Sequence, residues 1–312
     1  MTNHKLCLSD VRGHLPVKRA LEIAAAGGHS IALVGPPGAS KTMLARRLST
    51  ILPTLTEAEA AETTKIYEDA GLLPHTGPIT ERPFRAPHHT ISVAALCGGR
   101  MIPRPGEASL AHNGILFLDE YPEFQRRALE ALKLVIEDRE AVITGRPDTV
   151  RFPAAALIVT GSNDCPCGYR WSVRQKCRCE PSTVRRYHAR TSSHLTQMSV
   201  KTIDVRCDQL PLKPGGDSSE TIRERVVQAR LVQKLRLGEG RTNASMSPNE
   251  VTTYTELDEE TRPILEYCVK HFAMSARKTD NTLRVARTIA DLDGTETLNL
   301  GQVVEAVCYC AR

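Results

Sequence analysis

Residues 31–48, IALVGPPGASKTMLARRL, decide how this chain folds. They begin with a short β-prone apolar run, pass through a glycine-rich turn and end in a segment with apolar residues at helical spacing. A turn of this kind between a strand and a helix directs backbone N–H groups at phosphate oxygens. The stretch therefore predicts a phosphate-binding loop, with an ordinary strand–turn–helix connection as the alternative.

The residues of this loop have distinct expected roles. Gly35 and Gly38 supply the tight backbone path. Lys41 would reach the β- and γ-phosphates of a nucleotide, and Thr42 would hold Mg²⁺. The expected nucleotide-binding residues of the loop are Gly35, Pro36, Pro37, Gly38, Ala39, Ser40, Lys41, Thr42 and Met43.

Ser40 departs from the pattern G-x-x-x-x-G-K-[ST], because it stands at the second glycine. A side chain adds a Cβ where the backbone turns close to phosphate, and glycine tolerates that position best. Serine is the least intrusive polar replacement, and its hydroxyl could donate to a phosphate oxygen. We expect nucleotide binding that is weakened rather than abolished.

A second motif, ILFLDE at residues 115–120, fits the same chemistry. Four apolar residues form a buried strand that carries Asp119 to the carboxyl edge of the sheet, where its carboxylate can hold a Mg²⁺-bound water. Glu120 beside it can position or deprotonate the attacking water. The two motifs, in this order, predict a site for ATP and Mg²⁺.

The remaining pattern predicts an α/β fold with a second, helical part. Residues 155–163 form a third apolar strand, residues 129–138 an amphipathic helix, and residues 141–152 a β-hairpin. Continuous apolar strands alternating with helices indicate a parallel sheet covered on both faces. Residues 212–220 form a linker rich in Pro, Gly and Ser, and the segments beyond it have helical periodicity. We therefore divide the chain into a core of residues 1–212 and a C-terminal helical lid domain of residues 213–312.

Composition limits the classes of protein, and of binding partner, that fit this chain. The chain of 312 residues is 41% hydrophobic and 25% charged, as in ordinary globular proteins. Its first residues lack a signal-peptide core and its apolar runs are too short for a bilayer, so we expect a cytoplasmic protein with no membrane partner. The net charge of +5 permits a polyanionic partner, whereas an aromatic content of 4% disfavours a base-stacking platform.

One segment combines cysteines with basic residues. Cys165, Cys167, Cys177 and Cys179 form two C-x-C pairs, and four thiolates could close a tetrahedral zinc site. Free thiols in a surface loop are the alternative. The basic residues of the segment suit phosphate contacts with nucleic acid, and a solvated loop or a subunit interface is the alternative. These residues are Arg170, Arg174, Lys176 and Arg178, around Trp171, followed by Arg185 and Arg186.

Several long strings point to one family. They are DVRGHLPVKRALEIAAAGGHS (10–30), RPFRAPHHTISVAAL (82–96), PRPGEASLAHNGILFLDE (103–120), CPCGY (165–169) and LRVARTIADLDG (283–294). Through them nearly the whole chain resembles the magnesium-chelatase-like AAA+ ATPases of the YifB/ComM type. The resemblance implies a P-loop NTPase fold, ATP hydrolysis, a hexameric homo-oligomeric ring and action on DNA as a helicase or branch-migration motor in DNA uptake or recombination.

The resemblance also implies roles for particular residues. Asn163 is similar to sensor 1, the polar group that orients the lytic water. Arg277 is similar to the sensor 2 arginine, with Arg284 as the second choice. Val11 to Gly13 resemble the segment that lines the adenine, and the hairpin of residues 141–152 resembles the pre-sensor-1 hairpin. Glu120, Lys41, Asn163 and Arg277 are thus the expected catalytic residues, and Val11, Gly13, Asp119 and Arg284 join the expected cofactor contacts.

The chain departs from the family pattern in three respects. We expect it to lack the Lon-protease-like domain that usually precedes this core, and Ser40 replaces glycine. Near Thr202 the chain has no arginine where the family carries its arginine finger. These departures leave two rivals to a DNA motor. One is a regulatory or degenerate subunit that binds nucleotide and hydrolyses it weakly, and the other is a magnesium-chelatase-type subunit acting on a tetrapyrrole partner.

Overall fold

The computed structural model describes residues 6–73, 77–99, 103–144, 149–170, 175–197, 202–206 and 216–310. For residues 191–197 and 202–206 it describes the backbone elements only. The chain forms two compact units. The first unit comprises Met1–Ile31, Thr50–Pro53 and Lys201–Arg312, and the second comprises Ala32–Ser49 and Thr54–Val200.

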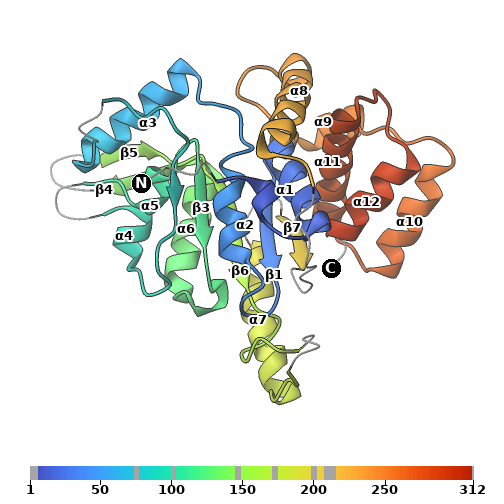
Figure 1. Ribbon diagram of the computed structural model, residues 1–312, viewed down its shortest axis with the longest axis horizontal. Helices are drawn as coiled ribbons and strands as arrows, with labels where there is room; N and C mark the ends of the chain where they lie inside the picture. Colours follow the sequence, from blue (N-terminus) through green and yellow to red (C-terminus); the bar gives the residue numbers. More distant parts are fainter. Residues whose placement is uncertain are drawn as a thin grey trace. The chain divides into compact units, whose positions relative to one another are not determined.

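A five-stranded sheet has the strand order β2-β3-β6-β1-β7. Its strands β1, β3 and β6 are labelled in Figure 1. Both β2 and β6 pair with β3 in parallel. The residues of β3 are all buried, as expected for a strand that is covered on both faces. The strands are β1 (Ser30–Val34), β2 (Phe84–Arg85), β3 (Ile115–Leu118), β6 (Leu157–Ser162) and β7 (Thr202–Arg206). The predicted parallel α/β core is confirmed.

The register of the sheet places three strand ends together. Leu118 lies opposite Thr160, so the residues that follow β3 emerge beside Gly161 at the end of β6. The backbone N–H of Gly35, which follows β1, donates to the carbonyl of Ser162 at 3.1 Å. The loops after β1, β3 and β6 therefore leave the sheet at one edge.

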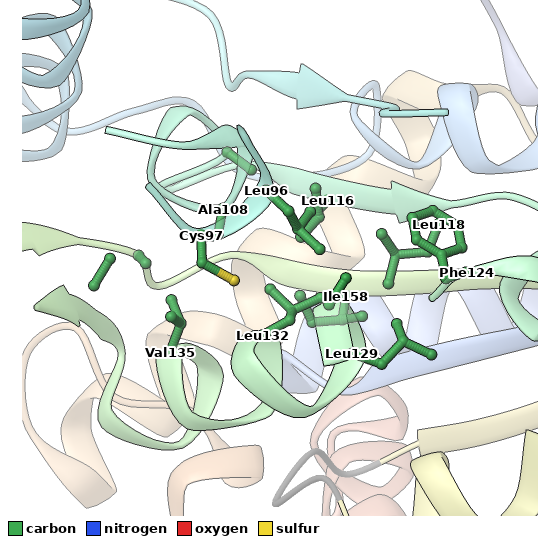
Figure 2. Close-up of a cluster of buried hydrophobic side chains, with 14 of the residues drawn as sticks. Leu96, Cys97, Ala108, Leu116, Leu118, Phe124, Leu129, Leu132, Val135 and Ile158 are labelled. Atoms are coloured by element: carbon green, nitrogen blue, oxygen red, sulfur yellow. The ribbon is translucent and has the colours of Figure 1, made fainter. Parts of the chain in front are cut away.

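A compact apolar core packs against the strands and supports this edge of the sheet. Leu116 of β3 and Ile158 of β6 pack with Leu129 and Leu132 of α6 (Arg126–Asp138), and Leu96 of α4 (Val93–Cys97) joins them (Figure 2). The predicted hairpin is confirmed as the antiparallel pair β4 (Glu140–Thr144) and β5 (Thr149–Pro153), and its residues 145–148 lie outside the described residues. Because the core fills the space between α6 and the sheet, the strand ends are rigidly supported.

The second unit contains further helices that the sequence pattern did not single out. The helix α3 begins at a capping box, in which Thr56 and Glu59 each accept from the other's backbone N–H. Arg82 then ties this helix start to the segment before β3, since it donates to Glu59 and to the carbonyl of Asn113. The remaining elements of this unit are α2 (Lys41–Leu48), α3 (Glu57–Ala70), α5 (Glu107–Leu110), η2 (Tyr121–Glu123) and α7 (Pro181–Gln197).

The first unit is helical apart from β7 and the start of β1. Its centre is α1, an apolar helix held by α8 through side chains that donate to its last carbonyls: Arg230 to Ala25 and Gln233 to Ala26. The helical periodicity predicted beyond residue 220 is confirmed, whereas the boundary at residue 212 stays a prediction. The elements are η1 (Leu8–Asp10), α1 (Leu15–Gly27), α8 (Ser219–Leu237), η3 (Asn243–Ser245), α9 (Pro248–Tyr254), α10 (Thr261–His271), α11 (Ala276–Asp293) and α12 (Leu300–Cys310).

A buried polar cluster joins three of these helical elements, and we call it the Asp291 cluster. Arg236 of α8 donates to both carboxylate oxygens of Asp291, at 3.0 and 2.5 Å. Asn243 of η3 and Arg287 of α11 add one hydrogen bond each, at 2.8 and 3.1 Å. Each oxygen of this fully enclosed carboxylate thus accepts two hydrogen bonds. The cluster fixes the positions of the helix ends that meet there.

Within the described parts of the chain, every helix is too short or too polar to cross a lipid bilayer.

Candidate nucleotide-binding site

The loop between β1 and α2 has a left-handed backbone at two positions. Gly38 has φ +80° and Ser40, which immediately precedes α2, has φ +60°. A non-glycine residue with this torsion destabilises the fold by roughly 1–2 kcal/mol, because its Cβ crowds the following carbonyl oxygen. Serine at position 40 is therefore unfavourable for two reasons. The sequence predicted that its Cβ lies close to phosphate, and the structure adds that its backbone torsion is left-handed.

Lys41, the first residue of α2, turns its ammonium group back over the loop. Its Nζ donates to the carbonyls of Gly35 and Pro36 at 2.7 and 3.0 Å, and to Oδ1 of Asn163 at 3.0 Å. Asn163 follows β6, so this contact joins two of the loops at the carboxyl edge of the sheet. The structure thus brings together the expected phosphate-binding lysine and the expected sensor 1 residue.

Thr42 and Asp119 form the second link between the two motifs. The Thr42 hydroxyl donates to Oδ2 of Asp119 at 2.8 Å, and the backbone N–H of Glu120 donates to Oδ1 at 3.0 Å. A Cβ on Gly161 would lie 2.6 Å from Oδ1 of Asp119, so this carboxylate needs a glycine beside it. Adjacent hydroxyl and carboxylate oxygens are the ligands that Mg²⁺ prefers, and the pair therefore fits a magnesium site.

Glu120 lies beside this pair and has an unexpected neighbour. Its side chain is 61% exposed, and Oε2 lies 3.2 Å from Nδ1 of His89. The ring of His89 stacks against His88, with centroids 4.1 Å apart, and His88 itself contacts the Thr90 hydroxyl. His88 thus forms a hydrogen bond within its own segment, whereas the contact of His89 with Glu120 reaches a separate motif and was missed. The motif RAPHHT carried no spacing signal that could have revealed it.

Comparison with known proteins identifies the family at this point. The family model described as magnesium chelatase, subunit ChlI, matches residues 7–210, and its C-terminal counterpart matches residues 216–310. The chain belongs to this magnesium chelatase family. Its relatives include the uncharacterized protein YifB of Escherichia coli, 38% identical over 97% of this chain, and the competence protein ComM of Haemophilus influenzae, 38% identical over 98%. An uncharacterized protein of Mycobacterium tuberculosis is 39% identical over 97% of this chain.

The resemblance to YifB and ComM that the sequence motifs predicted is confirmed. The chain spans 60% of the length of YifB and of ComM and 61% of the mycobacterial relative. Within the magnesium chelatase family, the sheet described above is the expected AAA+ core, and the helical segment after it is the expected C-terminal region.

The other expected nucleotide contacts of this family member lie in the first unit. Val11 is buried and its carbonyl accepts from the ammonium of Lys18, and Gly13 is also buried, with φ +62°. The two arginines considered for sensor 2 differ in exposure. Arg277 is exposed in the first turn of α11. Arg284 is only 6% exposed and is bound to the carbonyl of Met246.

Burial changes the pKa of the Arg284 side chain. Desolvation by the surrounding helices lowers the pKa of its guanidinium group. Two of its nitrogens donate to one carbonyl oxygen, at 3.1 and 2.7 Å, and a third donates to Asn281. The Arg284 guanidinium thus contacts neighbouring residues of the helical unit, and the assignment of sensor 2 to Arg277, with Arg284 as the second choice, stays a prediction.

The four cysteines singled out from the sequence do meet. The ligand atoms of Cys165, Cys167, Cys177 and Cys179 all lie within 4.8 Å of one another. Burial opposes ionisation of the Cys167 thiol, but the backbone N–H groups of Tyr169 and Arg178 donate to it and bring its pKa down to about 6. Burial raises the pKa of the neighbouring Cys165 thiol to about 12, so the thiols of the cluster differ in how readily they ionise.

Basic residues flank the cysteines in the sequence and continue along α7. Trp171 and Arg174 lie outside the described residues, as does the tip of the β4–β5 hairpin at residues 145–148. The described basic residues of the segment are all exposed: Arg170, Lys176, Arg178, Arg185 and Arg186.

Proposed function

We propose that this chain binds ATP with Mg²⁺ at the loop after β1 and hydrolyses it as a motor of the AAA+ class. The contact from Thr42 to Asp119 carries the proposal, because it brings the two halves of a magnesium site within 2.8 Å from separate motifs. Lys41, held on Asn163, adds the cation that phosphate binding needs. Family membership supports the same activity.

The roles of the residues follow from their chemistry. Backbone N–H groups of the loop and the ammonium of Lys41 bind the phosphates, and Thr42 and Asp119 would hold Mg²⁺. The metal supplies positive charge that offsets the charge developing on the transferred phosphoryl group. Glu120 receives the proton of the attacking water, while Asn163 orients that water. The residues proposed in supporting positions are Val11 and Gly13 at the adenine and Arg277 as sensor 2.

We further propose that the motor is a hexameric cytoplasmic ring that acts on DNA in uptake or recombination. The YifB/ComM resemblance implies this partner, and the competence protein ComM is among the relatives. The exposed arginines and lysine after β6 and along α7 support it, because phosphate contacts by such groups are independent of sequence. Mg-ATP binding does not depend on this part of the proposal.

A regulatory subunit that hydrolyses ATP weakly is the second candidate. The left-handed torsion of Ser40 favours it, since strain in the loop opposes its phosphate-binding form. The uncharged Thr202 favours it too, since an arginine finger is worth roughly 10³–10⁵ in rate in well-studied phosphoryl transfer. Under this candidate, Thr202→Arg raises turnover strongly while Mg-ATP affinity stays unchanged.

ATP turnover with and without DNA separates the candidates. A DNA motor hydrolyses ATP briskly when DNA is added, and Glu120→Gln lowers that rate roughly 10²–10⁴-fold while nucleotide binding persists. A weak hydrolase binds Mg-ATP and shows slow turnover that DNA leaves unchanged. A chelatase-type subunit also ignores DNA but is stimulated by a tetrapyrrole-binding partner. Absence of Mg-ATP binding in calorimetry contradicts all three.

A further inference from the structure

The sulfur atoms after β6 have the spacing of ligands that share one metal ion. The three distances among Cys165, Cys167 and Cys177 are 3.4, 3.7 and 3.6 Å. A tetrahedral site with Zn–S bonds of about 2.3 Å places its sulfurs about 3.8 Å apart. A disulfide needs about 2.05 Å, so the observed cluster consists of thiols, not of bonded pairs.

The described residues of this segment include few large apolar side chains. Between β6 and α7, residues 163–180 read NDCPCGYRWSVRQKCRCE, in which charged and polar residues outnumber large apolar ones. A polar segment of this kind gains little from apolar burial, so metal binding can supply the missing free energy of folding. Cys165 is nevertheless fully buried, and the N–H of Cys179 donates to Sγ of Cys177 at 3.5 Å. The fold has therefore gathered these side chains around a common point.

The charges of the segment suit a thiolate site. Four thiolates and one Zn²⁺ carry a net charge of −2, and the four thiol protons leave when the metal binds. Arg170, Lys176 and Arg178 stand next to the cysteines in the sequence and are exposed. Their positive charges offset the negative charge of the site.

The cluster also contacts the nucleotide-binding loop through a glycine. Gly168 has φ +81°, and its N–H donates to the carbonyl of Cys165 at 2.8 Å. A Cβ on Gly168 would lie only 2.4 Å from Cδ of Pro37 and 3.7 Å from Cγ of Asn163. The cysteine segment therefore packs directly against the loop and against the amide that holds Lys41.

We propose that Cys165, Cys167, Cys177 and Cys179 bind one zinc ion, and that this ion braces the nucleotide-binding loop through the contact of Gly168 with Pro37. The bracing role rests on the proposed function, whereas zinc binding does not. Zinc fits better than an iron–sulfur cluster, because the four sulfurs are close enough to share a single ion. Zinc also keeps a fixed charge and geometry, as a brace requires.

Metal analysis of the full chain purified without chelator tests the site. We expect one equivalent of zinc per chain, released when a mercurial reagent modifies the thiols. The double variant Cys177→Ser/Cys179→Ser should lose the metal. Its matched control, Cys268→Ser/Cys308→Ser, changes two cysteines outside the cluster and should keep it. Folded wild-type protein with only a trace of zinc, with stoichiometric iron, or with disulfides in place of thiols overturns the proposal.

Hydrogen exchange tests the brace without nucleotide. In wild-type protein stripped of zinc by the mercurial and a chelator, the loop amides of residue 35 and residues 38–40 should exchange faster, while those of α6 stay unchanged. Mg-ATP affinity should fall roughly tenfold, about the cost of ordering one further residue. Unchanged exchange in the loop overturns the bracing role. Zinc-loaded protein that fails to bind Mg-ATP contradicts the proposed function instead. The zinc content and the exchange rates are measured without nucleotide, so they test the zinc site and the brace independently of that function.

Discussion

The nucleotide site and the Asp291 cluster contain the same kinds of side chain but differ in how they are enclosed. In the Asp291 cluster the arginines and the amide bind the carboxylate itself, whereas at the nucleotide site Lys41 binds the amide and Thr42 binds the carboxylate. In the Asp291 cluster both carboxylate oxygens accept two hydrogen bonds and the side chain is 0% exposed. At Asp119, which is partly exposed, the described residues supply one donor to each oxygen.

This difference separates a structural carboxylate from one that can accept a ligand. A carboxylate with two oxygens has about four acceptor positions. The neighbours of Asp291 fill them, so the group stabilises the helices and nothing further can bind. Asp119 retains acceptor capacity beside a threonine hydroxyl, as a metal site requires. The same substitution made in both clusters therefore tests this distinction.

The largest effect is expected for Asp291→Asn. It leaves Arg236 and Arg287 buried without their counter-charge, and breaking a buried pair costs roughly 3–5 kcal/mol. Urea unfolding should show a clearly lower midpoint. The matched variant Asp119→Asn should unfold near the wild-type midpoint, since its site is partly exposed, and should lose Mg²⁺-dependent nucleotide binding. Equal destabilisation by the two variants contradicts the distinction between the clusters.

Lys41→Ala is expected to have the next largest effect, on Mg-ATP affinity. A hydrogen bond to a charged group is worth about 1.5–3 kcal/mol, so affinity should fall roughly tenfold to hundredfold. Calorimetry with Mg-ATP measures it, with Lys65→Ala as a control because Lys65 is an exposed lysine paired with Asp69 on α3. Equal binding by Lys41→Ala and the wild type would mean that the site is misassigned.

Ser40→Gly should change affinity in the opposite direction. Removing the Cβ relieves the left-handed torsion, which costs serine roughly 1–2 kcal/mol, so Mg-ATP should bind up to about tenfold more tightly. Gly38→Ala is the matched test of strain alone. Gly38 also has a left-handed torsion, and a Cβ there would meet no atom within 4 Å, so the variant should bind more weakly. Ser40→Gly protein with unchanged or weaker affinity contradicts this account of the loop.

Much of the fold and of this site was predictable because the signals are local. Apolar runs predicted β3 and β6, and the two motifs predicted that Thr42 and Asp119 would share a magnesium site at the carboxyl edge of a parallel sheet, whereas the role of Asn163 came from the family resemblance. The torsion of Ser40 was not predictable, since a sequence pattern gives no φ. The contact of His89 with Glu120 was missed for a similar reason, because the intervening chain folds through α4 and α5 before β3 brings Glu120 back.

Arg277 and Arg284 show a second limit of prediction from sequence. Both lie on α11 at helical spacing, and the sequence left both as candidates for one role. Only packing separates them, since Arg284 points into the helices around Met246 while Arg277 remains exposed. Burial of a long cationic side chain depends on the neighbouring helices, and one helix's own periodicity does not reveal which arginine they cover.

The smallest effect is expected for His89→Gln, which tests the missed contact. His89 touches Glu120 and no phosphate-binding residue that the structure describes, so it acts as a positioning residue for the proposed base. Since Glu120 is largely exposed, the contact resembles a surface pair, and kcat for ATP should fall by no more than about fivefold with KM unchanged. His88→Gln alters the stacked neighbour, which contacts Thr90, and should leave both constants at wild-type values. A rise in KM with kcat unchanged would place His89 in nucleotide binding and would contradict its role as a partner of Glu120. In Glu120→Gln protein, adding His89→Gln should lower the residual turnover no further, because the histidine then has no carboxylate to position.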